Sequence, residues 1–258
     1  MILKEKIGIP FFEFPNLSKY PAIWHGIFTK HGGYSKGPFR SLNVGNGLGD
    51  NHATVGKNRR IISHCIGDAD IVYANQNHGT DLIVFNKNDA TGTSFATNTT
   101  WIGDAMISNI TGKFLAMQVA DCQAVLIYNP VQQVVADVHV GWRGSVRNII
   151  GRTVRLMKTH FGCDPGDTFA GIGPSLGPCC AEYRNYRKEI PKAFWRYKDN
   201  SDCFDFWSIS ADQLANEGIP RANITLSRIC TKCRTDLFFS YRGEGVTGRF
   251  AVIIGLVR

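Results

Sequence analysis

The feature that most constrains the fold is a series of apolar segments in the middle of the chain. Strand-like apolar runs recur at 104–108, 114–120, 124–128 and 134–140, and another occupies 250–257. Runs that are apolar at nearly every position, instead of at alternate positions, are typical of strands covered on both faces. We therefore expect sheets buried beneath other elements, as in an α/β fold.

Helical segments complete this picture. Residues 145–161 show the clearest helical pattern, because Ile149, Ile150, Val154 and Met157 recur at helical spacing with basic residues between them. Gly162 is expected to end that helix. Further helices are predicted at 51–66, begun by Asp50 or Asn51, and at 184–197 and 208–217. Shorter strands are predicted at 24–29, 71–74, 81–85 and 168–173.

The predicted domain organisation is simple. Residues 1–20 are expected to be an irregular N-terminal lead-in with an aromatic patch, and residues 88–103, rich in Thr, Asn and Gly, a polar loop. No repeat, low-complexity tract or linker divides the remainder. We therefore expect residues 21–258 to form one compact α/β domain with mixed β-sheets and flanking helices.

Charge and composition argue against several classes of protein. The net charge of +8 is compatible with nucleic acid or with anionic substrates, but Lys and Arg are spread along the chain without a run of five. We therefore expect no nucleic-acid partner. No apolar run has the length of a membrane span, and the N-terminus carries charges where a secretory peptide needs apolar residues. These features predict a cytoplasmic protein without a membrane partner, in which the eight cysteines are mostly reduced thiols.

Three residues at strand ends have the composition of a working metal site. His78 precedes Gly79, Cys122 follows Asp121, and His139 closes an apolar run. Ends of strands are where α/β proteins collect catalytic groups. Two imidazoles and one thiolate suit zinc with a fourth position open for water or substrate. Such a metal lowers the pKa of a bound water toward neutrality. The spacing matches no zinc finger, so the three residues must meet through the fold.

Two other motifs offer weaker signals. The segment Gly141–Gly144 joins a strand to a helix, where backbone N–H groups and the guanidinium of Arg143 would suit phosphate; a purely structural turn is the alternative. Cys230 and Cys233 form a C-x-x-C pair without a second spaced pair, since Cys179 and Cys180 are adjacent. We expect these cysteines to be free thiols.

Missing motifs narrow the chemistry further. The chain contains no phosphate-binding G-x-x-x-x-G-K-[ST] loop and no H-x-E with P-C-x-x-C deaminase signature. It has seven histidines and no H-x-H pair, which argues against a multicopper laccase.

Several segments together resemble one protein family, the laccase-domain or polyphenol oxidase family, now viewed as purine nucleoside phosphorylases. The resemblance covers roughly residues 20–258. The segments that carry it are 25–29, 32–39, 41–45, 58–59, 76–79, 120–122, 139–144, 171–180, 239–242 and 247–249. In this chain they include Gln-Asn-His-Gly, Ala-Asp-Cys, His-Val-Gly-Trp-Arg-Gly and Gly-Ile-Gly-Pro-Ser-Leu-Gly-Pro-Cys-Cys.

The resemblance implies a sandwich of mixed sheets and a zinc site formed by His78, Cys122 and His139. It also implies phosphorolysis of adenosine, inosine, guanosine and 5′-methylthioadenosine, together with deamination of adenosine. Purine nucleosides and phosphate would then be the partners, with copper as an alternative metal. The oligomeric state stays open.

From these expectations we assign roles to individual residues. His78, Cys122 and His139 would act at the metal, and Asp121 would shuttle protons or stabilise the turn. The candidates for phosphate and ribose contacts are Ser41, Asn43, Arg59 and Arg143.

Three alternatives remain open. In a metal-free cysteine hydrolase, Cys122 would be the nucleophile and His139 its base. A non-enzymatic partner or redox protein would turn over no nucleoside. A copper-dependent phenol oxidase is the third alternative.

Overall fold

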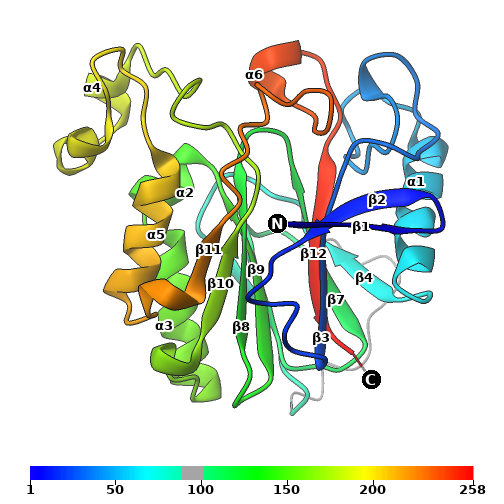
Figure 1. Ribbon diagram of the computed structural model, residues 1–258, viewed down its shortest axis with the longest axis horizontal. Helices are drawn as coiled ribbons and strands as arrows, with labels where there is room; N and C mark the ends of the chain where they lie inside the picture. The colour runs from blue at the N-terminus through cyan, green and yellow to red at the C-terminus, as the bar shows by residue number, and fades with distance from the viewer. Residues whose placement is uncertain (89–100, 258) are drawn as a thin grey trace.

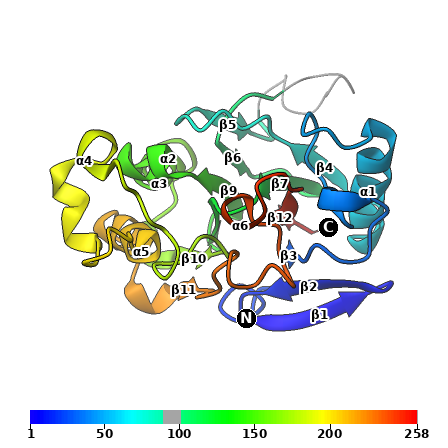
Figure 2. The same ribbon diagram turned by 90° about the horizontal axis from the view of Figure 1, so that it is seen from above.

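Two six-stranded mixed sheets form the centre of the computed structural model, which describes residues 1–88 and 101–257 (Figure 1). The sheets pack face to face, and helices lie outside each of them (Figure 2). The expected α/β domain with mixed sheets is confirmed. Most of the polar loop predicted at 88–103 lies outside the described residues.

The first sheet brings the two ends of the chain together. Its strand order is β1-β2-β3-β12-β7-β4, and only β4 and β7 pair in parallel. The strands are β1 (Ile2–Lys6), β2 (Ile9–Glu13), β3 (Ile23–Phe28), β4 (Asp70–Tyr73), β7 (Lys113–Val119) and β12 (Phe250–Leu256). Helix α1 (His52–Cys65) covers the outer face, where Ile62 and Cys65 pack with Phe114, Ala116 and Ile253.

The second sheet has the order β11-β10-β8-β9-β6-β5. Its strands are β5 (Leu82–Phe85), β6 (Ala105–Ser108), β8 (Gln123–Asn129), β9 (Val134–Val140), β10 (Phe169–Ile172) and β11 (Ile224–Leu226). Its outer face is covered by α3 (Ile149–Phe161) and α5 (Phe206–Asn216), and α2 (Trp142–Val146) packs against both helices. Short helices complete the described chain: α4 (Tyr186–Glu189), α6 (Tyr241–Glu244), and the 3-10 turns Gly37–Phe39, Pro165–Asp167, Lys192–Tyr197 and Arg221–Asn223.

The layered arrangement explains the apolar runs. Every residue of β8, β9 and β12 is buried. Between the two sheets, Met117 and Val252 pack with Leu126 and Tyr128. On the outer face of the second sheet, Val138 of β9 packs with Ile150 beneath α3. Burial of a large aliphatic side chain contributes about 1.5–3 kcal/mol, so this two-sided core is the main source of stability.

Several local predictions are wrong, each for a physical reason. The first 20 residues do not form an irregular lead-in, because β1 and β2 make a hairpin that continues into β3. The helix predicted at 145–161 is divided at Asn148, which adopts a left-handed conformation (φ 55°) and caps α3. Pro191 similarly divides the helix predicted at 184–197, since proline lacks an N–H and disfavours helical backbone before it. Strand β11 was not predicted.

Other boundaries agree with the sequence patterns. Asn51 caps α1 by accepting a hydrogen bond from the Thr54 N–H, and Gly162 ends α3 in a left-handed conformation. Among the described residues, no helix combines the length and apolar character needed to cross a bilayer.

Candidate active site

The fold brings His78, Cys122 and His139 together from three segments that are distant in the sequence. His78 follows β4, Cys122 lies between β7 and β8, and His139 is on β9. The potential ligand atoms of the three side chains all lie within 4.8 Å of one another. Cys122 Sγ is 3.8 Å from His78 Nε2, and the two imidazole rings are nearly perpendicular with centroids 4.9 Å apart.

Asp104 contacts the His139 imidazole and the backbone at His78, and it was not predicted as a functional residue. Its carboxylate is fully buried at the start of β6, with Oδ1 2.7 Å from His139 Nδ1. It also accepts hydrogen bonds from the backbone N–H groups of His78 and Gly79, at 3.0 and 2.7 Å. These contacts lower the pKa of Asp104 despite its burial, which by itself would raise it. A carboxylate behind an imidazole fixes its tautomer and leaves the other nitrogen free to bind a metal.

Backbone constraints hold the three side chains in place. His78 and Asp121 both adopt positive φ, 59° and 86°. A Cβ at Gly141 would lie 3.1 Å from His78 Cδ2 and 3.4 Å from Cys122 Sγ. Contact at this distance shows that the position beside the cluster has little room for a side chain.

The donor set fits zinc. Tetrahedral zinc holds sulfur at about 2.3 Å and nitrogen at about 2.0–2.1 Å, which places two such ligands about 3.6 Å apart. The 3.8 Å between Cys122 Sγ and His78 Nε2 is close to that value. Cys122 is also partly exposed and lines a cavity, so a fourth position would face the solvent side.

In the metal-free protein, electrostatic interactions set the protonation states of Cys122 and His139. Burial opposes the thiolate of Cys122, but the charge of His139 and hydrogen bonds from both imidazoles lower its pKa to about 6. Burial likewise opposes protonation of His139, yet Cys122 and Asp104 raise its pKa to about 9. Near neutral pH the metal-free protein therefore contains a thiolate–imidazolium pair.

This pairing predicts how metal affinity depends on pH. A metal ion binds neutral imidazole, so binding displaces the His139 proton and affinity rises with pH. We expect an increase of about tenfold per pH unit between about pH 7 and 8.5, levelling off above the His139 pKa. Competition with a chromophoric chelator at each pH measures the metal affinity. The result is corrected for protonation of the chelator and for the metal that a Cys122→Ser variant binds. An affinity that is constant over this range would contradict the assignment.

A second prediction concerns Asp104. Asp104→Asn places an amide against donors that now meet a carboxylate, so we expect the metal affinity of the His–Cys–His site to fall by about 10–100-fold. Asp81→Asn is the matched control, because Asp81 is exposed and only its backbone oxygen bonds to the same turn. Equal affinities of the two variants would remove Asp104 from the site.

The cluster lies in the wall of a cavity of about 550 Å³. An aromatic wall faces it, formed by Trp142, Tyr183 and Phe206, with Tyr183 within 5.4 Å of Phe206 and 6.4 Å of Trp142 between ring centroids. Two arginines also line the cavity, Arg242 and Arg249. The cavity thus combines a possible metal position, flat apolar surfaces and positive charge.

Arg249 is the better positioned of the two cations. Its Nη1 donates to the carbonyl oxygens of Thr247 and Gly248, which fixes the guanidinium. Burial lowers the pKa of Arg249, while the negative charges of Cys122 and Asp121 act in the opposite direction. Arg242 donates to the Glu182 carbonyl oxygen.

The carboxylate of Asp121 is engaged by three donors. The hydroxyls of Thr231 and Ser240 donate to Oδ1 at 2.6 and 2.7 Å, and the backbone N–H of Arg242 donates to Oδ2 at 2.5 Å. Asp121 lines the cavity, but its hydrogen bonds fasten the turn that presents Cys122. The geometry favours the turn-stabilising alternative over proton transfer.

The four residues predicted to contact phosphate and ribose do not line this cavity. Arg143 is exposed, with its guanidinium over the Trp142 ring. Arg59 stacks on Tyr73 and donates to Val44 O and Gln118 Oε1. Ser41 donates to Lys30 O.

Asn43 acts from beneath the cavity. It is fully buried, and its Oδ1 accepts hydrogen bonds from the backbone N–H groups of Gly45 and Arg249. Asn43 therefore positions two residues that line the cavity without reaching it.

Comparison with known proteins places this site in a family. Residues 24–257 match a family model described as multi-copper polyphenol oxidoreductase laccase. The chain belongs to this laccase-like family. Members of the laccase-like family similar to it include proteins named purine nucleoside phosphorylase. YlmD of Geobacillus stearothermophilus is 34% identical over 244 residues, covering 89% of each chain, and YfiH of Escherichia coli is 32% identical over 237 residues, covering 89% of this chain and 92% of its own.

Solved structures of the laccase-like family share the fold. The crystal structure of YlmD from G. stearothermophilus matches with a TM-score of 0.85 and 32% identity, covering 100% of this chain and 99% of that one. A protein of Neisseria meningitidis matches with a TM-score of 0.80 and 28% identity, covering 97% of this chain and 99% of that one.

Proposed function

We propose that this chain is a zinc-dependent purine nucleoside phosphorylase. The observation that carries the proposal is the cavity itself, in which His78, Cys122 and His139 face the same space as Arg249 and an aromatic wall. The names of the relatives at 29–34% identity support the same activity. The proposed substrates are adenosine, inosine, guanosine and 5′-methylthioadenosine, each with phosphate, and adenosine deamination is a proposed second activity.

The aromatic wall suits the purine base. Tyr183, Phe206 and Trp142 offer flat, mostly apolar surfaces, and a planar base gains about 0.5–1.5 kcal/mol from an aromatic contact beyond the area it buries. Asn75 also lines the cavity and offers a polar side chain for the base edge, whereas the amide of Gln76 is hydrogen-bonded to the Gln118 backbone.

Arg249 is the proposed phosphate ligand. A guanidinium donates two parallel hydrogen bonds to phosphate oxygens. Its contacts with Thr247 and Gly248 hold it without rearrangement, so the cost of ordering it is already met by folding. Arg242, also in the cavity lining, adds a second positive charge.

The proposed reaction is displacement at the anomeric carbon. A phosphate oxygen forms a bond to C1′ of the ribose as the bond from C1′ to the base nitrogen breaks. The electron pair of the broken bond goes to the base, which takes up a proton and leaves as the free purine, with ribose 1-phosphate as the second product. Positive charge on the sugar during this step is stabilised by the phosphate that Arg249 holds.

Zinc, when bound by His78, Cys122 and His139, supplies a Lewis acid that polarises an oxygen and lowers the pKa of water. Adenosine deamination needs no phosphate: water adds at C6 and ammonia leaves, giving inosine. Copper is an alternative occupant of the same ligands. We place the protein in the cytoplasm, which is supported by the free thiols of its eight cysteines.

Oxygen-isotope labelling tests the reaction type. In water enriched in ¹⁸O, phosphorolysis yields ribose 1-phosphate without label, while deamination of adenosine yields inosine carrying ¹⁸O. Labelled free ribose as the main sugar product would indicate hydrolysis and would overturn the phosphorylase proposal.

A cysteine hydrolase is a second candidate, because the thiolate–imidazolium pair of Cys122 and His139 is also that of a cysteine nucleophile and its base. The two candidates differ in their response to metal. A chelator should abolish phosphorylase activity and added zinc should restore it, whereas a cysteine hydrolase would keep its activity in the chelator and lose it to iodoacetamide.

A further inference from the structure

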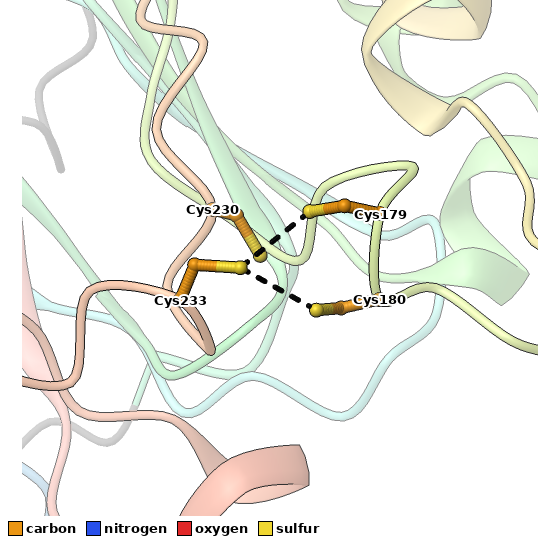
Figure 3. A group of neighbouring side chains, drawn as sticks. All are labelled: Cys179, Cys180, Cys230 and Cys233. Atoms are coloured by element: carbon orange, nitrogen blue, oxygen red, sulfur yellow. Dashed lines mark hydrogen bonds between the residues drawn. The ribbon is translucent and has the colours of Figure 1, made fainter.

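A second group of metal-ligand side chains lies outside the nucleoside cavity. Cys179 and Cys180 come from the turn after β10, and Cys230 and Cys233 from the segment before α6 (Figure 3). The four sulfur atoms all lie within 4.8 Å of one another. Two segments about fifty residues apart in sequence thus present all their thiols to one point.

The spacing of the sulfurs suits a metal and not a disulfide. Cys233 Sγ is 3.6 Å from both Cys179 Sγ and Cys180 Sγ. Two thiolates bound to one tetrahedral zinc at about 2.3 Å are about 3.8 Å apart, while a disulfide bond is only about 2.05 Å long. All four cysteines carry free thiols.

Backbone donors support negative charge at the cluster. The N–H of Gly177 donates to Cys230 Sγ at 3.3 Å, the type of contact that stabilises a metal-bound thiolate. Four thiolates and Zn²⁺ would carry a net charge of −2, and Lys232, next to Cys233 in sequence, carries the opposite charge.

We propose that Cys179, Cys180, Cys230 and Cys233 bind one structural zinc ion as four thiolates. A C-x-x-C motif needs a second pair of ligands to complete a zinc site. Cys179 and Cys180 supply that pair, although adjacent cysteines are not recognisable as a ligand pair from their spacing in the sequence. Binding releases the thiol protons to solvent, and all four coordination positions are filled by sulfur, so the site holds no reactive water.

The ion would fasten together the two segments that support the cavity. Leu176 donates its backbone N–H to the Asp121 carbonyl, and Thr231, between the two cysteines of the motif, donates its hydroxyl to the Asp121 carboxylate. The zinc therefore closes a ring around the turn that presents Cys122. This structural zinc site goes beyond the proposed function, because its role is only to keep these two segments joined.

Metal counting on matched variants tests the site. By mass spectrometry of protein from zinc-supplemented medium, we expect about two zinc ions per chain in the wild type, one in Cys122→Ser, one in Cys233→Ser and none in the double variant. Cys203→Ser is the control. Cys203 lies outside both groups, so this variant should retain both zinc ions.

X-ray absorption distinguishes the two sites. The zinc left in Cys122→Ser should show four sulfur ligands at about 2.3 Å, and the zinc left in Cys233→Ser a mixture of nitrogen and sulfur. A Cys122→Ser variant without zinc, or a mass showing a disulfide among these cysteines, would overturn the proposal. Because the wild type and Cys122→Ser keep all four thiols, misfolding of Cys233→Ser cannot mimic these results.

Discussion

Cys122→Ser is expected to lower kcat/KM for adenosine phosphorolysis by about 10³-fold, which corresponds to about 4 kcal/mol of transition-state stabilisation. The substitution replaces the only thiolate among the three ligands with a hydroxyl that binds zinc poorly. It also removes the partner that raises the pKa of His139. Steady-state kinetics with adenosine and phosphate, together with zinc content, measure the effect.

Two comparisons give this result its meaning. Cys203→Ser should retain wild-type activity, because Cys203 lies outside the site. Cys122→Asp separates ligand from nucleophile, since a carboxylate binds zinc but cannot replace a thiolate in a thioester. Zinc retained with measurable phosphorolysis in Cys122→Asp would support a ligand role, while full activity of Cys122→Ser would exclude any role for the residue.

Arg249→Met is expected to raise the KM for phosphate by about 100-fold, close to 2.7 kcal/mol, with a much smaller effect on adenosine deamination. Phosphate loses its charged partner, whereas deamination uses water and has no phosphate to hold. The backbone N–H of residue 249 still donates to the Asn43 side chain in this variant, so the segment before β12 should keep its conformation. Both activities are measured on the same preparation, with thermal unfolding as a check of the fold.

Arg143→Met is the matched control for this experiment. Arg143 was one of the candidate phosphate ligands from the sequence, but its side chain is exposed and outside the cavity lining. We expect its KM for phosphate to change less than about twofold, as is usual for exposed positions. Equal losses in the Arg143 and Arg249 variants, or equal losses of phosphorolysis and deamination in the Arg249 variant, would reject the phosphate assignment.

The meeting of the three candidate metal ligands could be predicted because their local sequences are informative. His78, Cys122 and His139 each interrupt or end an apolar run beside a small or turn-forming residue, and strand ends are where the fold gathers reactive groups. Their convergence depends on the pairing of β6, β8 and β9, which no local pattern specifies.

The remaining site residues depend on tertiary contacts. In the sequence, Asp104 looks like any acidic residue that precedes a strand. Only the pairing of β6 with β9 places its carboxylate behind His139. Arg249 lies before β12, near no other predicted site residue in sequence. The helix break at Asn148 was hidden because the apolar periodicity continues across it, while Cys179 and Cys180 were discounted for being adjacent.

The most direct test of the account is a single incubation of the zinc-loaded protein with adenosine, with and without phosphate. The account predicts adenine and ribose 1-phosphate only when phosphate is present, and loss of both after the zinc is removed by a chelator. Release of adenine at the same rate without phosphate, or no release in either sample from zinc-loaded protein, would contradict it.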